Sequence, residues 1–227
     1  MRTKKKYALI DMDGTLYDSM PYHNRAWREM MAENGVATKP DEFFLYEGMT
    51  GYDTINLIFN RELGRSTTRE EARRLYDRKA EIFVSYGEKG LIKDADKMIG
   101  MLIDKGIGRV LVTGSAQQSL LSRLEHDFPG GFSRDKMVTA HDVEHGKPDP
   151  EPYLKGLEKA GVGADEAFVI ENAPLGVRAG KRAGIFTVAL MTGPIPREEF
   201  EREGADLIFT SMTEFTEALP DLIENGF

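Results

Sequence analysis

From about residue 90 onward, short apolar runs alternate with stretches of helical spacing, and this alternation constrains the fold more than any other feature. We expect strands over 108–112, 137–139, 167–170, 185–190 and 207–209, with helices over 96–105, 118–128, 150–160 and 174–183. Strands that are joined by helices at this spacing form right-handed crossovers in a parallel sheet. The pattern therefore predicts an α/β protein.

A further strand is expected at Tyr7–Ile10, a short apolar run that is followed by Asp11-Met12-Asp13 and a Gly-Thr turn. Side chains alternate along a strand, so Asp11 and Asp13 would point the same way and could reach one metal ion and one phosphate. Ligands of open α/β sheets bind at the carboxyl ends of the strands. The alternative is a turn with two solubilising acids. The functional interpretation is a carboxylate nucleophile for phosphoryl transfer.

Between these two parts, the apolar spacing from Pro21 to Gly87 is helical. Ser66-Thr67-Thr68 followed by Glu70 and Glu71 is typical of a capped helix start. We therefore expect an all-helical domain over residues 17–88, inserted into an α/β core formed by residues 1–16 and 89–227. Because the insert begins just after the Asp pair, it should lie over the site.

The composition narrows the classes of partner. The 227 residues include no cysteine, so disulfides and thiolate metal sites are excluded. The net charge of −8 and the lack of any basic block beyond Lys4–Lys6 argue against nucleic acid. No stretch has the apolar length of a membrane span or signal peptide. We expect a cytoplasmic monomer that binds a small phosphorylated or diphosphate substrate.

Three later segments place polar groups where strands end. Thr113, Gly114 and Ser115 follow the strand at 108–112, and a Gly turn with a hydroxyl can hold phosphate oxygens; Ser115 and Ala116 would offer backbone N–H groups. Lys147 stands in a loop with two prolines and could offset charge on the transferring group. Glu171 and Asn172 form a second polar pair that closes the strand at 167–170, and a hard divalent cation such as Mg²⁺ suits a few carboxylates with phosphate and water. His126, His141 and His145 lack the spacing of a zinc site.

These four segments, in this order, resemble the motifs of the haloacid dehalogenase superfamily of phosphotransferases. The resemblance implies a Rossmann-like core with a small helical cap. It implies that Asp11 is the nucleophile, Asp13 the general acid/base, Thr113 a phosphate ligand and Lys147 the charge-balancing lysine. Magnesium would be held by Asp11, the Asp13 carbonyl and the pair Glu171 and Asn172.

The segments 22–27 and 171–176 are similar to the β-phosphoglucomutase branch of that superfamily, with three departures. That branch carries a basic Lys-Gly-x-x-Arg element in its cap, but here the element is Glu47-Gly48-Met49-Thr50-Gly51. The lysine of the element is thus replaced by Glu47 and its arginine by Gly51, and losing the arginine removes a bidentate phosphate ligand. The third departure is Asn172, where an aspartate is usual. Glu47 could restore the charge that Asn172 lacks if the closing cap brings it to the metal, and this pattern looks most like the inorganic pyrophosphatase offshoot found in Bacteroides.

Several alternatives remain open on the sequence alone. A sugar phosphomutase, a sugar-phosphate phosphatase or a phosphate-binding protein without catalysis would share the core motifs. Glu47 could be an exposed cap acid. His23 matches the histidine that aligns the general acid/base in mutase relatives, or it is a packing residue. Lys79 matches a lysine that touches substrate phosphate, or it is an exposed helix residue. Trp27 is expected to pack in the cap core.

Overall fold

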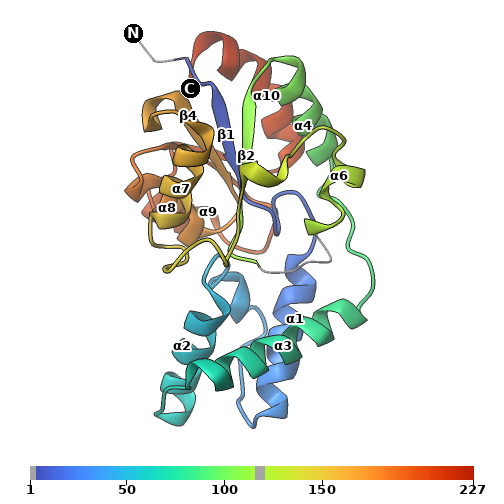
Figure 1. Ribbon diagram of the computed structural model, residues 1–227, viewed down its shortest axis with the longest axis vertical. Helices are drawn as coiled ribbons and strands as arrows, with labels where there is room; N and C mark the ends of the chain where they lie inside the picture. Colours follow the sequence, from blue (N-terminus) through green and yellow to red (C-terminus); the bar gives the residue numbers. More distant parts are fainter. Residues whose placement is uncertain (1–3, 116–120) are drawn as a thin grey trace.

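The computed structural model describes residues 4–115 and 121–227 and contains one six-stranded parallel sheet (Figure 1). Its strand order is β3-β2-β1-β4-β5-β6. The strands are β1 (Tyr7–Ile10), β2 (Gly108–Val112), β3 (Met137–Val138), β4 (Ala167–Glu171), β5 (Phe186–Leu190) and β6 (Leu207–Phe209). The expectation of an α/β fold with a parallel sheet is confirmed.

The central strand β1 lies between β2 and β4 and is buried from Ala8 to Ile10. Ile10 lies opposite Leu111 on one side and Ile170 on the other. The chain builds the sheet outward from β1 to β3, then returns to the other side of β1 for β4. This reversal opens a crevice at the carboxyl ends of β1 and β4, where ligands bind in sheets of this order.

Helices cover both faces of the sheet (Figure 1). The helices α4 (Ala95–Asp104) and α10 (Met212–Asn225) pack together on one face, and α7 (Glu151–Ala160) and α8 (Pro174–Arg182) pack on the other. The shorter elements of the core are α6 (Leu124–Asp127), α9 (Arg197–Arg202), η2 (Arg134–Lys136) and η3 (Ala164–Glu166). Among the described residues, no helix is long and apolar enough to cross a membrane.

A separate group of helices lies beyond the carboxyl ends of the strands (Figure 1). It contains α1 (Met20–Glu33), η1 (Glu42–Phe44), α2 (Gly51–Leu63) and α3 (Arg69–Ser85), with α3 packed on both α1 and α2. Trp27 stacks on Phe43 with 5.6 Å between ring centroids, and Thr68 caps α3 by accepting a hydrogen bond from the Glu71 N–H. We call residues 17–88 the cap, and this boundary remains our proposal.

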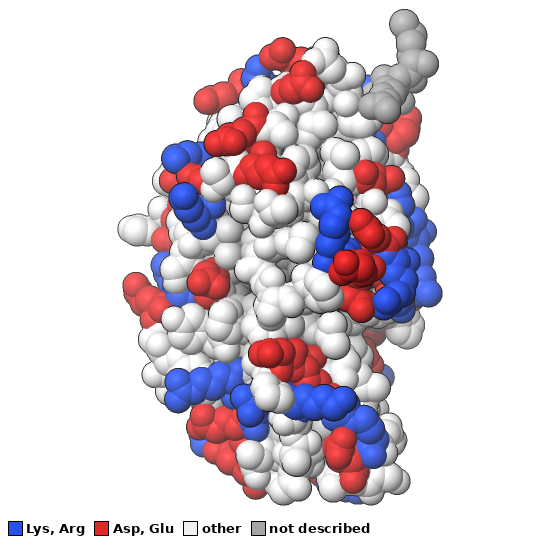
Figure 2. Space-filling view, turned by 180° about the vertical axis from the view of Figure 1, so that it is seen from behind, with Lys and Arg blue, Asp and Glu red and all other residues white. Residues whose placement is uncertain are grey.

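Charged side chains are mixed over the face seen in Figure 2, with acidic and basic groups next to one another. In the cap, exposed charged side chains pair with one another, as Arg78 does with Glu33 and Arg65 does with Glu71. Such exposed pairs contribute little to stability. These pairs identify basic side chains of the cap whose charge is already balanced by an acidic neighbour.

The helical spacing located most elements within a few residues, but it missed α9 and α10. Both contain or follow a proline: Pro196 precedes α9, and Pro220 lies inside α10. Proline normally ends a helix, so the pattern around it favours a loop. The expected helix over 118–128 begins outside the described residues, and its described part is α6.

Packing of α7 on the sheet depends on Gly156, since a Cβ there would overlap the buried side chain of Leu9. We expect Gly156→Leu to lower the free energy of unfolding by about 1–3 kcal/mol through overpacking. Urea unfolding measures the change. Gly100→Leu in α4 is the matched control, because no atom outside its own helix turn lies within 4 Å of the place where its Cβ would stand. Equal stability of the two variants would contradict this account of α7 packing.

Candidate active site

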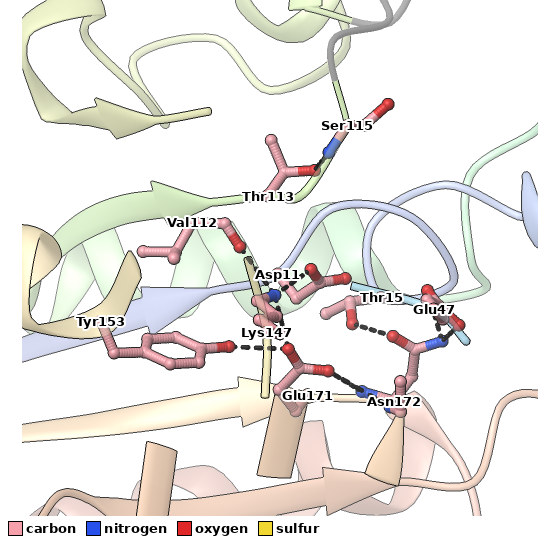
Figure 3. A network of polar contacts seen from close by, with 11 residues as sticks. Asp11, Thr15, Glu47, Val112, Thr113, Ser115, Lys147, Tyr153, Glu171 and Asn172 are labelled. Carbon is pink, nitrogen blue, oxygen red and sulfur yellow. Dashed lines mark hydrogen bonds and ion pairs between the residues drawn. The ribbon is translucent and has the colours of Figure 1, made fainter. Parts of the chain in front are cut away.

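The carboxyl ends of three strands meet at the ammonium group of Lys147 (Figure 3). Lys147 Nζ lies 2.6 Å from Asp11 Oδ1 and 2.6 Å from Glu171 Oε1, and it donates to the Val112 carbonyl at 3.0 Å. Only 1% of Lys147 is exposed. Burial alone would lower its pKa, but the charges of Asp11 and Glu171 raise the pKa of Lys147 above its usual value. Lys147 is therefore a fixed positive charge beside Asp11.

Asp11 keeps one carboxylate oxygen free. Its Oδ2 is buried and has no hydrogen-bond partner among the described residues, and Asp11 lines a cavity between cap and core. Burial raises the pKa of Asp11 well above its usual value; Lys147 opposes this effect and Glu171 adds to it. A buried acceptor without a partner is costly unless a ligand completes it. This oxygen is placed to attack an electrophile or to bind a cation.

Asp13 is held by two hydrogen bonds from the start of the cap. Ser19 Oγ donates to Asp13 Oδ1 at 2.6 Å, and His23 Nε2 lies 2.9 Å from the same oxygen. Burial disfavours ionisation of Asp13, but His23 and the Ser19 hydroxyl together lower its pKa below the usual value. The side chain is therefore held in its ionised form.

His23 connects Asp13 to Lys79 of α3. His23 Nδ1 lies 2.6 Å from Lys79 Nζ, and burial together with the Lys79 charge lowers the pKa of His23 to about 4. A neutral ring that accepts from Lys79 at Nδ1 carries its proton on Nε2, where it donates to Asp13. The cap thereby sets the orientation of the general acid/base.

Lys79 is buried, which excludes the alternative of an exposed helix lysine. It is 2% exposed, and its Nζ lies 5.1 Å from the Trp27 ring centroid and 5.3 Å from that of Phe83. Burial lowers the pKa of Lys79 to about 7, although the charge of Asp13 opposes the shift. Trp27 belongs to the cap core as expected, and it also lines the cavity.

Glu47 reaches from the cap to the core and contacts Asn172 (Figure 3). Asn172 Nδ2 lies 3.1 Å from Glu47 Oε1 and 3.0 Å from Oε2, and Thr15 donates to Asn172 Oδ1 at 3.0 Å. Burial raises the pKa of Glu47 well above its usual value, and the negative charge of Asp11 adds to the shift. Glu47 is 9% exposed, so the alternative of an exposed cap acid does not hold.

The loop that carries Glu47 lies against the core. Gly48 has a positive φ of 90° and packs on the Lys147 side chain, and its carbonyl faces Gly114 so closely that a Cβ at Gly114 would overlap it. The ring of Tyr76 occupies the space where a side chain at Gly51 would begin. The cap loop and Tyr76 therefore leave no room for a larger residue at position 51.

Thr113, Gly114 and Ser115 line the same cavity, as the sequence predicts. The Ser115 N–H donates to Thr113 Oγ1 at 3.0 Å in this arrangement (Figure 3), so a phosphate would have to compete for that donor. Ala116 lies outside the described residues. The segment retains a hydroxyl and a glycine turn at the end of β2.

The donor set fits a hard divalent cation. Four buried carboxyl groups stand with only two buried lysines: Asp11, Asp13, Glu47 and Glu171 with Lys79 and Lys147. The raised pKa values of Asp11 and Glu47 show that their negative charge lacks enough compensation within the protein. No three His, Asp or Glu side chains in the described residues already form a metal cluster. The free Asp11 oxygen, the Asp13 carbonyl and the Asn172 amide oxygen would therefore have to supply ligands, and Mg²⁺ takes such a mixed oxygen set.

Glu171 is engaged in a different way from that implied by the resemblance. Its Oε1 contacts Lys147 and accepts from the Tyr153 hydroxyl at 2.7 Å, while its Oε2 accepts from the backbone N–H groups of Asn172 and Ala173. Both oxygens are thus used within the protein. The amide oxygen of Asn172 likewise accepts from Thr15, so a cation would have to share or replace these contacts at either residue.

Sequence reasoning missed three residues of this site. Tyr153 lies in α7 and appears in sequence as an ordinary core aromatic, and Tyr76 appears as one among several in α3. Ser19 stands just before Met20, where a helix cap is expected, but its hydroxyl bonds Asp13 instead. Only tertiary contacts identify these roles. His126, His141 and His145 are exposed, and none is among the residues that line the cavity.

Comparison with known proteins agrees with this geometry. A family of haloacid dehalogenase-like hydrolases matches residues 5–184, so the chain belongs to this family of hydrolases. A solved structure from Bacteroides vulgatus, described as a candidate β-phosphoglucomutase, is 43% identical with a TM-score of 0.94 and covers 97% of this chain and 90% of its own.

Two curated relatives are phosphatases by name. Hexitol phosphatase A of Escherichia coli is 29% identical, with 92% of each chain covered. Glycerol-1-phosphate phosphohydrolase 2 of Saccharomyces cerevisiae is 30% identical, with 90% of this chain and 82% of the relative covered. These names agree with the family of haloacid dehalogenase-like hydrolases to which the chain belongs and which generally uses Mg²⁺.

The lowered pKa of Lys79 has a consequence for stability. Between pH 7 and 10 the unfolded chain holds a proton on Lys79 that the folded protein has lost, so the free energy of unfolding should rise with pH. We expect wild type to gain about 1–3 kcal/mol relative to Lys79→Met between pH 7 and pH 9.5. Urea unfolding at both pH values measures this. Lys39→Met removes an exposed cap lysine and should show no such difference; a pH-independent gap between wild type and Lys79→Met would contradict the account.

Proposed function

We propose that this protein hydrolyses inorganic pyrophosphate with magnesium, through a phosphorylated Asp11. The observation that carries the substrate assignment is the contact of Glu47 with Asn172. Glu47 brings a cap carboxylate to Asn172, the position at which relatives carry an aspartate. Substrate selection and the charge of the metal site would therefore both depend on Glu47.

Asp11 would act as the nucleophile through its free oxygen. Attack on phosphorus forms the aspartyl phosphate and releases the leaving group; water then attacks the phosphorus and regenerates Asp11. Lys147 stabilises the added negative charge without moving, because both of its carboxylate partners already hold it. When bound, magnesium would neutralise charge on the phosphoryl oxygens.

Asp13 would take the proton of the attacking water. Its lowered pKa keeps Asp13 ionised, which is the form that accepts a proton. A phosphate leaves as a stable anion, whereas a sugar alkoxide needs a proton as it departs. Hydrolysis of an anhydride therefore requires only the basic role of Asp13.

The size of the cavity supports the same assignment. The space beside Asp11 is about 60 Å³, below the roughly 300–1,000 Å³ of ordinary ligand pockets. A larger anion would need a basic side chain of the cap to bind its second charged group. Glu47 and the Tyr76 ring occupy the space in which such a side chain would stand. A small substrate that is chelated by a metal fits best.

A sugar- or polyol-phosphate phosphatase is the second candidate. The names of the relatives from Escherichia coli and Saccharomyces cerevisiae favour it, and their identity of 29–30% extends over most of the chain. A phosphomutase is less well supported, because it must bind both phosphates of a bisphosphate and the cap lacks an arginine at Gly51.

Steady-state phosphate release with magnesium separates these candidates. We expect kcat/KM for pyrophosphate to exceed that for every sugar or polyol phosphate by at least about a hundredfold. Asp11→Asn should lower turnover by about a thousandfold or more, because an amide does not attack phosphorus. A profile biased toward an ester would support the second candidate, and turnover in a chelator without magnesium would contradict the metal assignment.

The role of Glu47 has its own test. Glu47→Gln keeps the shape but removes the charge, so kcat/KM for pyrophosphate should fall about ten- to a hundredfold while that for esters changes less than about threefold. Glu88→Gln, at an exposed position of the cap, is the control and should leave both unchanged. Equal losses on both substrate classes would show that Glu47 does not select pyrophosphate.

A further inference from the structure

A second cleft adjoins the catalytic cavity on its outer side. It has a volume of about 370 Å³, and it shares Gly51, Tyr76 and Gly114 with the lining of the catalytic cavity. These three residues thus lie between the two spaces, and we call them the neck. Arg69 and Arg73 of α3 line the cap side of the cleft, and His141 lines the core side.

The two arginines belong to the cap arginines that form no salt bridge within the described residues, as do Arg28 and Arg74, while three others are paired. Arg61, Arg65 and Arg78 each pair with a glutamate. Within the described residues, Arg69 and Arg73 have no acidic partner; Arg69 lies over the ring of Tyr52 at 5.1 Å from its centroid. On the face seen in Figure 2, basic groups mostly stand beside acidic ones. The cleft therefore holds two guanidinium groups whose charge is not neutralised by a neighbour.

The positive charge of the cleft lies beside a cavity whose negative charge would repel an anionic substrate. The chain carries a net charge of −8, and the catalytic cavity presents Asp11, Asp13 and Glu47. An anionic substrate is repelled by both. Positive charge that lines the approach to a site raises the local substrate concentration and the rate of association.

We propose that this cleft is an anion-binding vestibule in which Arg69 and Arg73 bind phosphate-bearing molecules before they pass the neck to Asp11. Guanidinium groups suit this task because they bind phosphate oxygens in pairs and remain charged at every physiological pH. The ligand class is a small phosphate or diphosphate anion. The proposal rests on the proposed function only in that the substrate is a phosphate compound.

The vestibule acts on capture and not on the chemical step. Arg69 and Arg73 do not line the catalytic cavity, so their removal should change kcat/KM and leave kcat intact. The effect should also fade as salt screens the charges. These two properties separate the vestibule from a second catalytic role.

The test compares Arg69→Gln/Arg73→Gln with wild type, using the best substrate of the panel above. At low ionic strength we expect kcat/KM to fall about three- to tenfold and kcat to change less than about twofold. At about 0.5 M salt the difference should disappear. The matched control is Arg28→Gln/Arg74→Gln, which removes two exposed cap charges that do not line the cleft.

Two results would overturn the proposal. The first is an unchanged kcat/KM in the vestibule variant. The second is an equal loss in Arg28→Gln/Arg74→Gln, which would show that the effect comes from the net charge of the protein and not from the cleft. Calorimetric binding of inorganic phosphate at low salt gives an independent measurement, and it should weaken by a similar factor in the vestibule variant alone. If wild type hydrolyses no phosphate compound, the proposed function fails, but the calorimetry still decides whether the vestibule binds phosphate.

Discussion

The ion pairs of Lys147 with Asp11 and Glu171 are the interactions on which the rest of the site depends. They join residues that follow or end β1 and β4, and the Val112 carbonyl adds the end of β2. A buried lysine is tolerated only with such partners, since losing one leaves an unpaired charge. The register of the sheet, with Ile10 opposite Leu111 and Ile170, brings these groups together. The strand order and register of the sheet therefore determine the geometry of the site.

The cap adds a second layer of charge to this core. Lys79 acts through His23 on Asp13, and Glu47 acts on Asn172. Each contact crosses from a cap element to a group at the end of a core strand. Movement of the cap would break both at once, so the protonation and orientation of Asp13 and the charge beside Asn172 depend on cap position. The core alone would retain the nucleophile but would lose these controls.

Much of this could be predicted from the sequence, and for a physical reason. Strands buried in a parallel sheet and the polar residues that follow them are local features, so Asp11, Thr113 and Asn172 could be located in advance. Lys147 could be located by its loop with two prolines. Other contacts depend on which helix packs on which, as for Tyr153 with Glu171 or Tyr76 with Gly51. Periodicity does not contain that information. The resemblance to relatives supplied Glu47 and His23, but not the burial of Lys79 or the saturated contacts of Glu171.

The choice between a pyrophosphate and a sugar phosphate is a question about the leaving group. The core chemistry is common to both, because attack by Asp11 and stabilisation by Lys147 do not involve the departing half of the substrate. An alkoxide leaving group needs a proton from a general acid, whereas a phosphate leaves as a stable anion. A sugar would also need space at the neck that Tyr76 occupies. An enzyme that prefers an ester must supply both this proton and this space. If the cap has to rearrange to supply them, the cost of the rearrangement reduces the binding energy that is left for catalysis.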